Sequence, residues 1–166
     1  MAGRTDNNVK GIWIEGTNTK YIPANLGFLF NLTVLLVQNS NLIEIKSENF
    51  LGMQKLHVLS LDINKLTSLS SDTFSTLTKL KTLSLSYNQI EVIPSNLFSN
   101  NLNLEYINLQ TNKIKYIGSG VFDQLKMLTD VYLSGNIGSG CVEDGSGCVE
   151  EGSRCVEDGS RCFEVQ

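Results

Sequence analysis

Hydrophobic positions recur every 24 residues along most of this chain. Three ladders carry them: Leu32, Leu56, Leu80, Leu104 and Leu128; Leu35, Leu59, Leu83, Ile107 and Val131; and Val37, Leu61, Leu85, Leu109 and Leu133. Within each unit they read L-x-x-L-x-L, which predicts a short strand whose second and third apolar positions point into a core. A fixed repeat of this length is typical of a solenoid in which the strands of successive units pair in parallel. We therefore predict one solenoid over residues 9–137, with about six units and a degenerate first unit.

Two further ladders are expected to hold the coils together. The polar ladder is Ser40, Asn64, Asn88, Asn112 and Asn136, and the aromatic ladder is Phe50, Phe74, Phe98 and Phe122. An Asn side chain can bond main-chain groups where the chain leaves a strand and turns, and a Ser does this more weakly. The Phe rings are expected to fill the wider return side. In that segment Asn101 replaces an apolar residue, and we expect Leu102 to supply the missing group.

The spacing L-x-x-L-x-L-x-x-N over residues 9–137 resembles the typical, extracellular class of leucine-rich repeats, which includes Toll-like receptors and secreted insect repeat proteins. The resemblance implies an α/β solenoid, a horseshoe with a short-stranded parallel concave sheet and a mostly irregular or 3-10 convex side. It also implies protein recognition on the concave face, outside the cell. The chain departs from that class because no Cys precedes the solenoid and the four that follow lack the usual cap spacing.

The register predicts which side chains occupy the concave face. Candidate partner-binding residues are Leu36, Val58, Ser60, Asp62, Tyr87, Tyr106, Asn108, Gln110 and Tyr132. The three tyrosines form a cluster of a residue type enriched in interface hot spots, although β-propensity alone also favours Tyr on strands. A second, apolar patch combines Trp13 with Val34, Leu36 and Val58. For this patch we favour a structural role, in which Trp13, Ile12 and Ile14 shield the core of the first unit.

Charge and hydropathy limit the classes of partner. Residues 1–137 carry eleven Lys/Arg against ten Asp/Glu, and residues 138–166 carry two Arg against seven acids. Neither part is basic, which argues against nucleic-acid binding. No apolar run approaches the ~18–20 residues that span a bilayer. Residues 1–8 are polar, and we expect them to be disordered. The start contains no signal peptide, so the protein is either intracellular or a secreted protein without its leader.

Nothing in the sequence indicates enzymatic activity, a metal site or a cofactor. His57 is the single histidine, and the register places no Ser or Cys nucleophile beside it. Neither a Gly-rich phosphate loop nor a zinc spacing occurs in the solenoid. The tripeptide Asn31-Leu32-Thr33 is a candidate glycosylation site if the chain enters the secretory pathway.

The tail, residues 138–166, has a different period of seven. Its units GSGCVED, GSGCVEE, GSRCVED and GSRCFEVQ space Cys141, Cys148, Cys155 and Cys162 equally. Low hydrophobicity and negative charge favour disorder. The alternative is a pair of hairpins, because turns at Asp144-Gly145 and Asp158-Gly159 would place Cys141 opposite Cys148 and Cys155 opposite Cys162. These four residues are the disulfide candidates.

Three roles follow from these patterns. The favoured role is a non-enzymatic module that binds a protein on its concave face, as in extracellular recognition or innate immunity. The alternative is a structural or self-assembling protein whose tail cysteines form disulfides within or between chains. A homo-oligomer could also form if the last strand, near Leu133, pairs its uncovered edge with a second copy.

Overall fold

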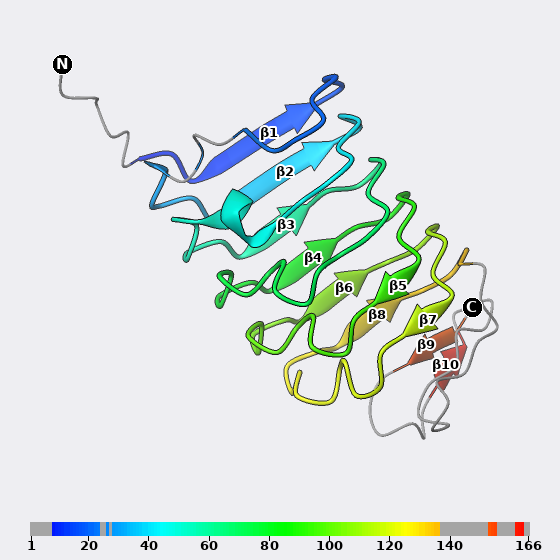
Figure 1. Ribbon diagram of the computed structural model, residues 1–166. Helices are drawn as coiled ribbons and strands as arrows, with labels where there is room; N and C mark the ends of the chain where they lie inside the picture. The colour runs from blue at the N-terminus through cyan, green and yellow to red at the C-terminus, as the bar shows by residue number, and fades with distance from the viewer. Residues whose placement is uncertain (1–7, 24–25, 27, 137–152, 156–161, 165–166) are drawn as a thin grey trace, which may run out of the picture.

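Six short parallel strands form one sheet in the computed structural model, which describes residues 8–23, 26, 28–136, 153–155 and 162–164 (Figure 1). The strands are β1 (Gly11–Glu15), β2 (Val34–Gln38), β3 (Val58–Ser60), β4 (Thr82–Ser84), β6 (Tyr106–Asn108) and β8 (Asp130–Tyr132). They are ordered β1-β2-β3-β4-β6-β8, so each coil of the chain adds one strand beside the previous one. This arrangement confirms the predicted solenoid with a parallel sheet.

The strand register follows the sequence ladders. Leu35 pairs with Leu59, which pairs with Leu83. The ladder continues through Ile107 to Val131. All five side chains are fully buried, because a repeat of constant length returns equivalent residues to equivalent positions in every coil.

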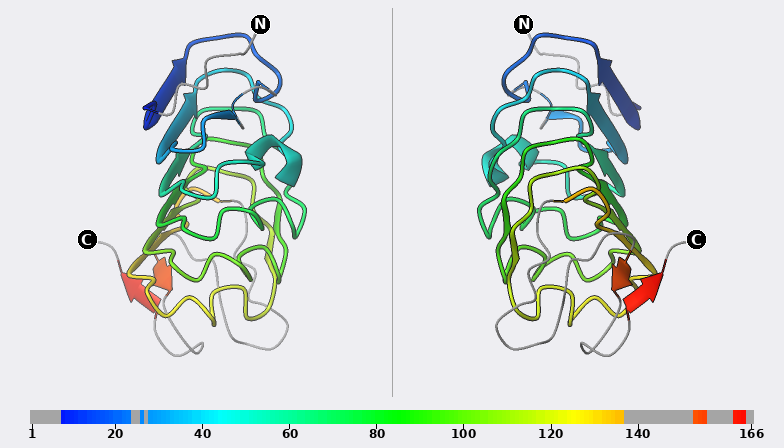
Figure 2. Two further views of the ribbon diagram at one scale, coloured as in Figure 1. Left: turned by 90° about the vertical axis from the view of Figure 1, so that its left-hand side faces the viewer. Right: turned by 90° about the vertical axis from the view of Figure 1, so that its right-hand side faces the viewer.

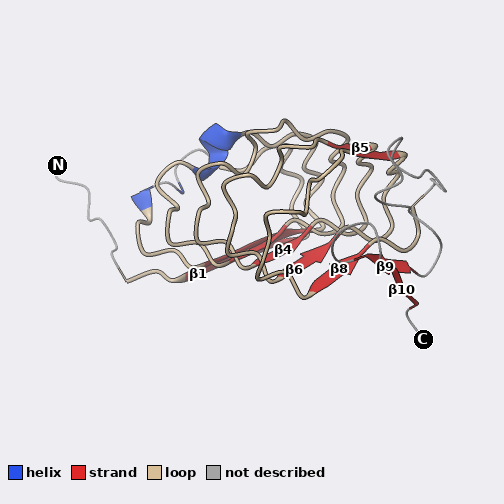
Figure 3. Cartoon of the chain, turned by 90° about the horizontal axis from the view of Figure 1, so that it is seen from below, coloured by secondary structure: helices blue, strands red, loops and turns tan. Residues whose placement is uncertain are grey.

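The side opposite the sheet is built mainly of turns. It also holds the 3-10 helix η2 (Ser47–Phe50) and a small parallel pair, β5 (Val92–Ile93) with β7 (Tyr116–Ile117). Figure 2 shows the six-stranded sheet along one side of the coils and the turns along the other. Figure 3 places β5 across the molecule from the main sheet. The prediction of a mostly irregular or 3-10 return side is confirmed.

The Asn ladder ties neighbouring coils together through buried side chains. Asn88 donates from Nδ2 to the carbonyl oxygens of Leu61 and Leu85, each at 3.0 Å, and accepts the backbone N–H of Leu66 through Oδ1 at 3.0 Å. Asn64, Asn112 and Asn136 repeat this pattern. The predicted backbone role of the ladder is therefore confirmed.

Ser40 occupies the same ladder position in the second coil with fewer bonds. Its hydroxyl donates once, to the carbonyl of Gln38 at 2.8 Å. A hydroxyl has one donor, whereas an Asn amide has two on its nitrogen and an acceptor beside them. Ser40 therefore makes fewer side-chain hydrogen bonds than the Asn residues of the ladder, as the sequence predicted.

The Phe ladder forms a continuous column on the return side. Ring centroids of Phe50 and Phe74 lie 6.1 Å apart, those of Phe74 and Phe98 6.4 Å, and those of Phe98 and Phe122 6.1 Å. The first three rings are almost fully buried, whereas Phe122, in the last coil, is only partly covered. Tilted or stacked aromatic rings at these separations add to the apolar burial that holds the coils together.

The expectation for Leu102 is wrong. Leu102 is 49% exposed, whereas the polar Asn101 is fully buried at the position occupied elsewhere by Met53, Leu77 and Leu125. Asn101 tolerates burial because its Nδ2 donates to the carbonyl oxygens of Phe74 and Leu77, each at 2.9 Å. Its Oδ1 has no hydrogen-bond partner.

The predicted shield of the first coil is only partly correct. Ile12 and Ile14 pack on the hydrophobic core. Trp13, between them, is 68% exposed, because alternate residues of a strand point to opposite faces of the sheet. Trp13 therefore covers no core.

Two short strands of the tail are described. β9 (Ser153–Cys155) and β10 (Cys162–Glu164) pair antiparallel, with Cys155 directly opposite Cys162. This is the register predicted for a turn at Asp158-Gly159. β9 lies beside β8, so the last strand of the solenoid has a described neighbour (Figures 1 and 3). The expected disorder of residues 1–8 and of the tail falls mainly on residues outside the described ones, as does the predicted pairing of Cys141 with Cys148.

Candidate functional site

The candidate site is the outward face of the six-stranded sheet, here called the open face. It comprises the strand residues that point away from the core and the residues at the strand exits. Along its middle row Trp13, Leu36, Ser60, Ser84, Asn108 and Tyr132 are register partners. The predicted candidates Leu36, Ser60, Asn108 and Tyr132 all lie in this row. The open face has three parts of different chemistry: an apolar end, a polar centre and a tyrosine end.

The apolar end lies over the first three strands. Trp13 projects from β1, and Leu36 and Val58 beside it are half-buried. Val34 and Val58 are direct partners in the sheet. The structure thus brings together the apolar patch predicted from the sequence, on the open face rather than around the core.

The polar centre is a hydrogen-bonded network around Asp62. Its Oδ1 accepts the hydroxyls of Ser84 at 2.6 Å and Ser86 at 2.8 Å, and also the backbone N–H of Ser86 at 2.7 Å. Its Oδ2 accepts the hydroxyl of Ser60 at 2.6 Å. Gln38 donates from Nε2 to Ser60 Oγ at 2.6 Å. The network spans β2 to β4.

This network changes the expected role of two candidates. Ser60 is only 6% exposed, and the carboxylate oxygens of Asp62 already accept four donors within 2.8 Å. A carboxylate offers about four lone-pair sites. Asp62 and Ser60 therefore cross-link neighbouring strands, and they present a preorganised polar surface rather than free groups.

The tyrosine end lies over the last strands. The rings of Tyr106 and Tyr132 are tilted by 42° with centroids 5.3 Å apart. Tyr87, one coil earlier, is 58% exposed at the strand exit. Gln110 beside them donates from Nε2 to Ser134 Oγ at 2.6 Å, and Asn108 Oδ1 accepts the backbone N–H of Gln110 at 3.0 Å. The amphipathic rings are thus held on a surface that is hydrogen-bonded within itself.

The surroundings of Tyr106 keep its phenol protonated. Burial raises the pKa of Tyr106 above its ordinary value, and Tyr132, Asp62 and Asp130 add to the increase because nearby negative charge disfavours the phenolate. A hydrogen bond with Asn108 acts in the opposite direction. Tyr106 therefore offers a neutral hydroxyl over a wide pH range.

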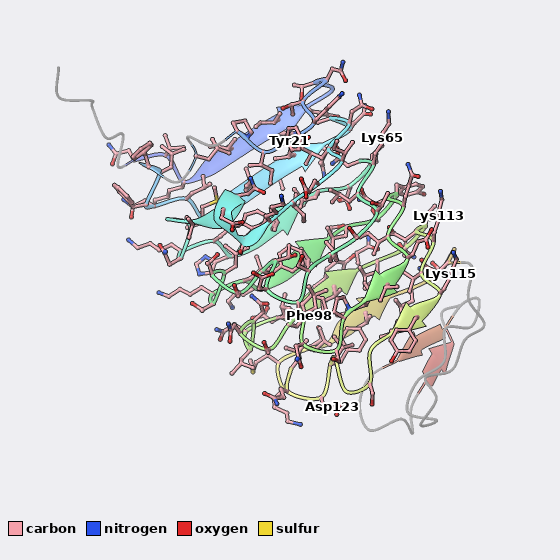
Figure 4. The ribbon with its side chains drawn as sticks, in the orientation of Figure 1. Tyr21, Lys65, Phe98, Lys113, Lys115 and Asp123 are labelled. Carbon is pink, nitrogen blue, oxygen red and sulfur yellow. The ribbon has the colours of Figure 1, made fainter. Side chains whose placement is uncertain are left out.

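The charged side chains on the open face are all acids. At the outward strand positions they are Glu15, Asp62 and Asp130. Lysines instead project beyond the ends of the strands, as Figure 4 shows for Lys65 and Lys113. Lys115 lies on the return side, directly before β7, where it pairs with Glu91 at 3.0 Å. The outward strand positions of the open face consequently carry negative charge.

Sequence reasoning missed a strained backbone position at the strand exits. The residues at this position all have positive φ: Gly16 (64°), Asn39 (48°), Ile63 (56°), Tyr87 (53°), Thr111 (52°) and Gly135 (74°). This region is unfavourable for side chains branched at Cβ, such as Ile63 and Thr111. The sequence did contain an indication of this backbone conformation, since Gly or Asn, which tolerate positive φ, occupy the equivalent position in three coils.

The glycosylation candidate lies away from the open face, at the edge where strands begin. The Oδ1 of Asn31 accepts Lys55 Nζ at 2.7 Å, and Thr33, the third residue of the tripeptide, donates its hydroxyl to the carbonyl of Lys10 at 2.9 Å. Glycosylation of Asn31 stays a prediction.

Comparison with known proteins agrees with this geometry. A family model for the leucine-rich repeat matches residues 30–90 and 78–136. No curated protein matches the chain. Within the described part of the chain, no helix is long and apolar enough to cross a membrane. The match covers more than half of the chain and does not distinguish among classes of the family, so the resemblance to the extracellular class stays a prediction.

Proposed function

Because the chain belongs to the leucine-rich repeat family, whose repeats form a non-enzymatic fold that mediates protein–protein interaction, we propose that it binds a protein partner on its open face. The observation that carries this proposal is the tyrosine end, where Tyr106 and Tyr132 pair at 5.3 Å beside the exposed Tyr87. Tyr is enriched among the few residues that dominate interface energies. A rigid ring also loses little conformational entropy on binding.

The charge of the open face indicates the partner's chemistry. Asp62 and Asp130 lie near Tyr106, and both raise its pKa by their negative charge. A cationic side chain is attracted both by carboxylates and by the faces of aromatic rings. We infer a partner that places an Arg or Lys over the tyrosine end.

Selection from a displayed peptide library tests this proposal. Peptides retained by the wild-type protein and rejected by Tyr132→Ala should be enriched in Arg and Lys. Their affinity should fall about thirtyfold in Tyr106→Ala or Tyr132→Ala, the loss expected of a hot spot. Tyr116→Ala is the matched control, because Tyr116 is 48% exposed on β7, on the opposite side of the solenoid. The proposal would be contradicted if the peptides bound Tyr106→Ala and Tyr132→Ala as tightly as the wild type but failed to bind Tyr116→Ala.

The extracellular assignment rests on the resemblance alone. It predicts that the chain, expressed behind a secretory leader, is glycosylated at Asn31, which lies at a strand entrance with a partly exposed side chain. A mass decrease on glycosidase treatment, absent in Asn31→Gln, would support extracellular recognition such as innate immunity. An unmodified Asn31 would argue against it.

A second role concerns the tail cysteines. The register of β9 and β10, with Cys155 opposite Cys162, supports a disulfide within one chain over cross-links between chains. In this step the two thiols lose two protons and two electrons to a small disulfide such as oxidised glutathione, which is reduced to thiols. Directly opposed residues in antiparallel strands have Cβ atoms ~4.5–5.5 Å apart, so closure needs a small local adjustment to reach the ~3.8 Å typical of disulfides.

Peptide mapping of non-reduced protein separates these outcomes. A Cys155–Cys162 peptide in monomeric protein supports internal closure. A ladder of disulfide-linked multimers supports self-assembly instead. A Cys141–Cys162 link, or four thiols that all react with an alkylating agent, would contradict the hairpin.

A further inference from the structure

The two ends of the main sheet differ in what lies beside them. At the last strand, β8, the described strand β9 lies alongside. At the first strand, β1, no described strand lies on the outer side. β1 and β2 are also the longest strands of the sheet, with five residues each. An uncovered strand of this length presents a row of backbone groups that can pair with another strand.

The backbone groups that β1 presents outward can be identified from its bonds to β2. The carbonyl of Lys10 accepts the N–H groups of Thr33 and Val34, and the N–H of Gly16 donates to the carbonyl of Gln38. Since alternate residues of a strand bond to the same neighbour, the even-numbered residues of β1 face β2. The N–H and C=O groups of Gly11, Trp13 and Glu15 therefore point to the open edge.

We propose that two copies of this chain pair antiparallel through β1, with a two-fold axis beside Trp13. This register sets Trp13 opposite Trp13 of the second copy, and Gly11 opposite Glu15. All of these residues turn both backbone groups outward, so the pair exchanges roughly six hydrogen bonds. A two-fold contact uses the same patch on both copies, which this strand can supply because its outward groups are symmetric about Trp13.

Like-charge repulsion favours the antiparallel arrangement over the parallel one. Lys10 precedes the strand and Glu15 ends it, and both are exposed. The antiparallel register sets Glu15 of each copy opposite the uncharged Gly11 of the other, and Lys10 opposite Gly16. In-register parallel pairing would instead align Glu15 with Glu15 and Lys10 with Lys10, and like charges directly opposite each other across strands are unfavourable. Common protections of a sheet edge, such as Pro or an inward-pointing charge, do not occur at residues 11–14.

The pairing also covers apolar surface. Trp13 is 68% exposed, and its ring would lie against its own symmetry mate. Ile12 and Ile14, which are only partly buried at the end of the core, would meet each other across the axis. The axis is perpendicular to the sheet, so the two open faces point the same way and join into one continuous surface. The tyrosine end of the open face lies on the last strands, away from β1, so this proposal is independent of partner binding there.

Sedimentation equilibrium in the presence of reductant tests the pairing without interference from the tail cysteines. The wild-type chain should show a reversible dimer. Gly11→Glu should weaken it about tenfold or more, because the new carboxylate lies directly opposite Glu15 of the other copy at two places per dimer. A Cβ at Gly11 meets only the Cβ of Val34, at 3.9 Å, so the substitution fits the single copy. The double variant Gly11→Glu/Glu15→Lys should restore the dimer, because opposite charges then face each other.

A substitution at the axis provides the second measurement. Trp13→Arg places two positive charges against each other and should leave a monomer, with circular dichroism unchanged since Trp13 packs on no core. Tyr116→Arg, at another exposed aromatic residue on the opposite side of the solenoid, should still dimerise. A wild-type monomer at all concentrations, or a dimer unaffected by Trp13→Arg and by Gly11→Glu, would overturn the proposal.

Discussion

Asn88 donates a hydrogen bond from its side-chain nitrogen to the carbonyl oxygen of Leu61, 27 residues earlier, at 3.0 Å. The bond joins the turn of one coil to the strand of the previous coil. It lies in the buried interior, where an unpaired backbone group would lose its hydration without compensation. This relationship recurs down the solenoid and makes neighbouring coils depend on one another.

Removing this link should lower the stability of the whole solenoid. We expect Asn88→Ala to reduce the free energy of unfolding by about 2 kcal/mol, because the buried N–H of Leu66 loses its partner and the carbonyls of Leu61 and Leu85 each lose one of theirs. Urea unfolding followed by circular dichroism measures this change. Asn103→Ala is the control, since Asn103 is exposed and bonds only the carbonyl of Thr78. A loss below about 0.5 kcal/mol at Asn88, the range of ordinary surface changes, would contradict the role of the ladder.

Replacing the buried Asn101 with Leu should stabilise the protein. The Oδ1 of Asn101 has no partner, and the carbonyls of Phe74 and Leu77 that accept its Nδ2 each also accept a backbone N–H. Asn101→Leu therefore removes an unsatisfied group without stranding others, and we expect a gain of about 1 kcal/mol. Thermal and urea unfolding measure it.

The control at this position is Asn101→Ala, which removes the same amide but leaves a cavity. It should lower the free energy of unfolding by about 2 kcal/mol. If Leu destabilised the chain as much as Ala, the two bonds of Asn101 would be worth more than its unpaired oxygen costs.

Relieving backbone strain at Ile63 should also stabilise the protein. Ile63 is 53% exposed and has φ of 56°, a conformation that costs a Cβ-branched residue about 1–2 kcal/mol. Asn tolerates this region, and Asn39 already occupies the equivalent position one coil earlier. We expect Ile63→Asn to raise the free energy of unfolding by about 1 kcal/mol, measured in urea.

Ile43→Asn provides the comparison, because Ile43 is similarly exposed but has no positive φ. The free energy of unfolding of Ile43→Asn should differ from that of the wild type by less than about 0.5 kcal/mol. Equal effects of the two substitutions would mean that hydrophobicity, rather than strain, decides the outcome.

Stability at alkaline pH should depend on Tyr106. Its pKa is raised by burial above the ordinary value of 10.0, which applies to the unfolded chain. The folded state therefore holds this proton more tightly. The resulting stability is fully present below pH 10.0 and is lost as pH rises through the folded pKa.

Ultraviolet titration of tyrosinate and urea midpoints as a function of pH measure this effect. Tyr106→Phe should unfold with a weaker alkaline dependence than the wild type, because no proton is released at that site. An identical pH dependence in the two proteins would show that burial of Tyr106 does not control its ionisation.

The periodic sequence determined the architecture, because identical spacing of Leu, Asn and Phe allows only one way for every coil to bury the same positions. The strand ladders through Leu59 and Leu83, the buried Asn bonds and the Phe column follow from this. The same logic placed Tyr106 beside Tyr132. Turn chemistry at Asp158-Gly159 also predicted the register of Cys155 with Cys162.

The tertiary structure alone decided how residues that break the pattern are accommodated. Asn101 is buried and Leu102 is exposed because two carbonyls of the preceding coil accept hydrogen bonds from the side-chain nitrogen of Asn101, a fact of three-dimensional placement. Asp62 became the centre of a network because donors from β3 and β4 converge on it across the sheet. Trp13 faces outward because strand alternation overrides its hydrophobicity. Contacts between coils depend on distances across the sheet, which spacing along the chain does not specify.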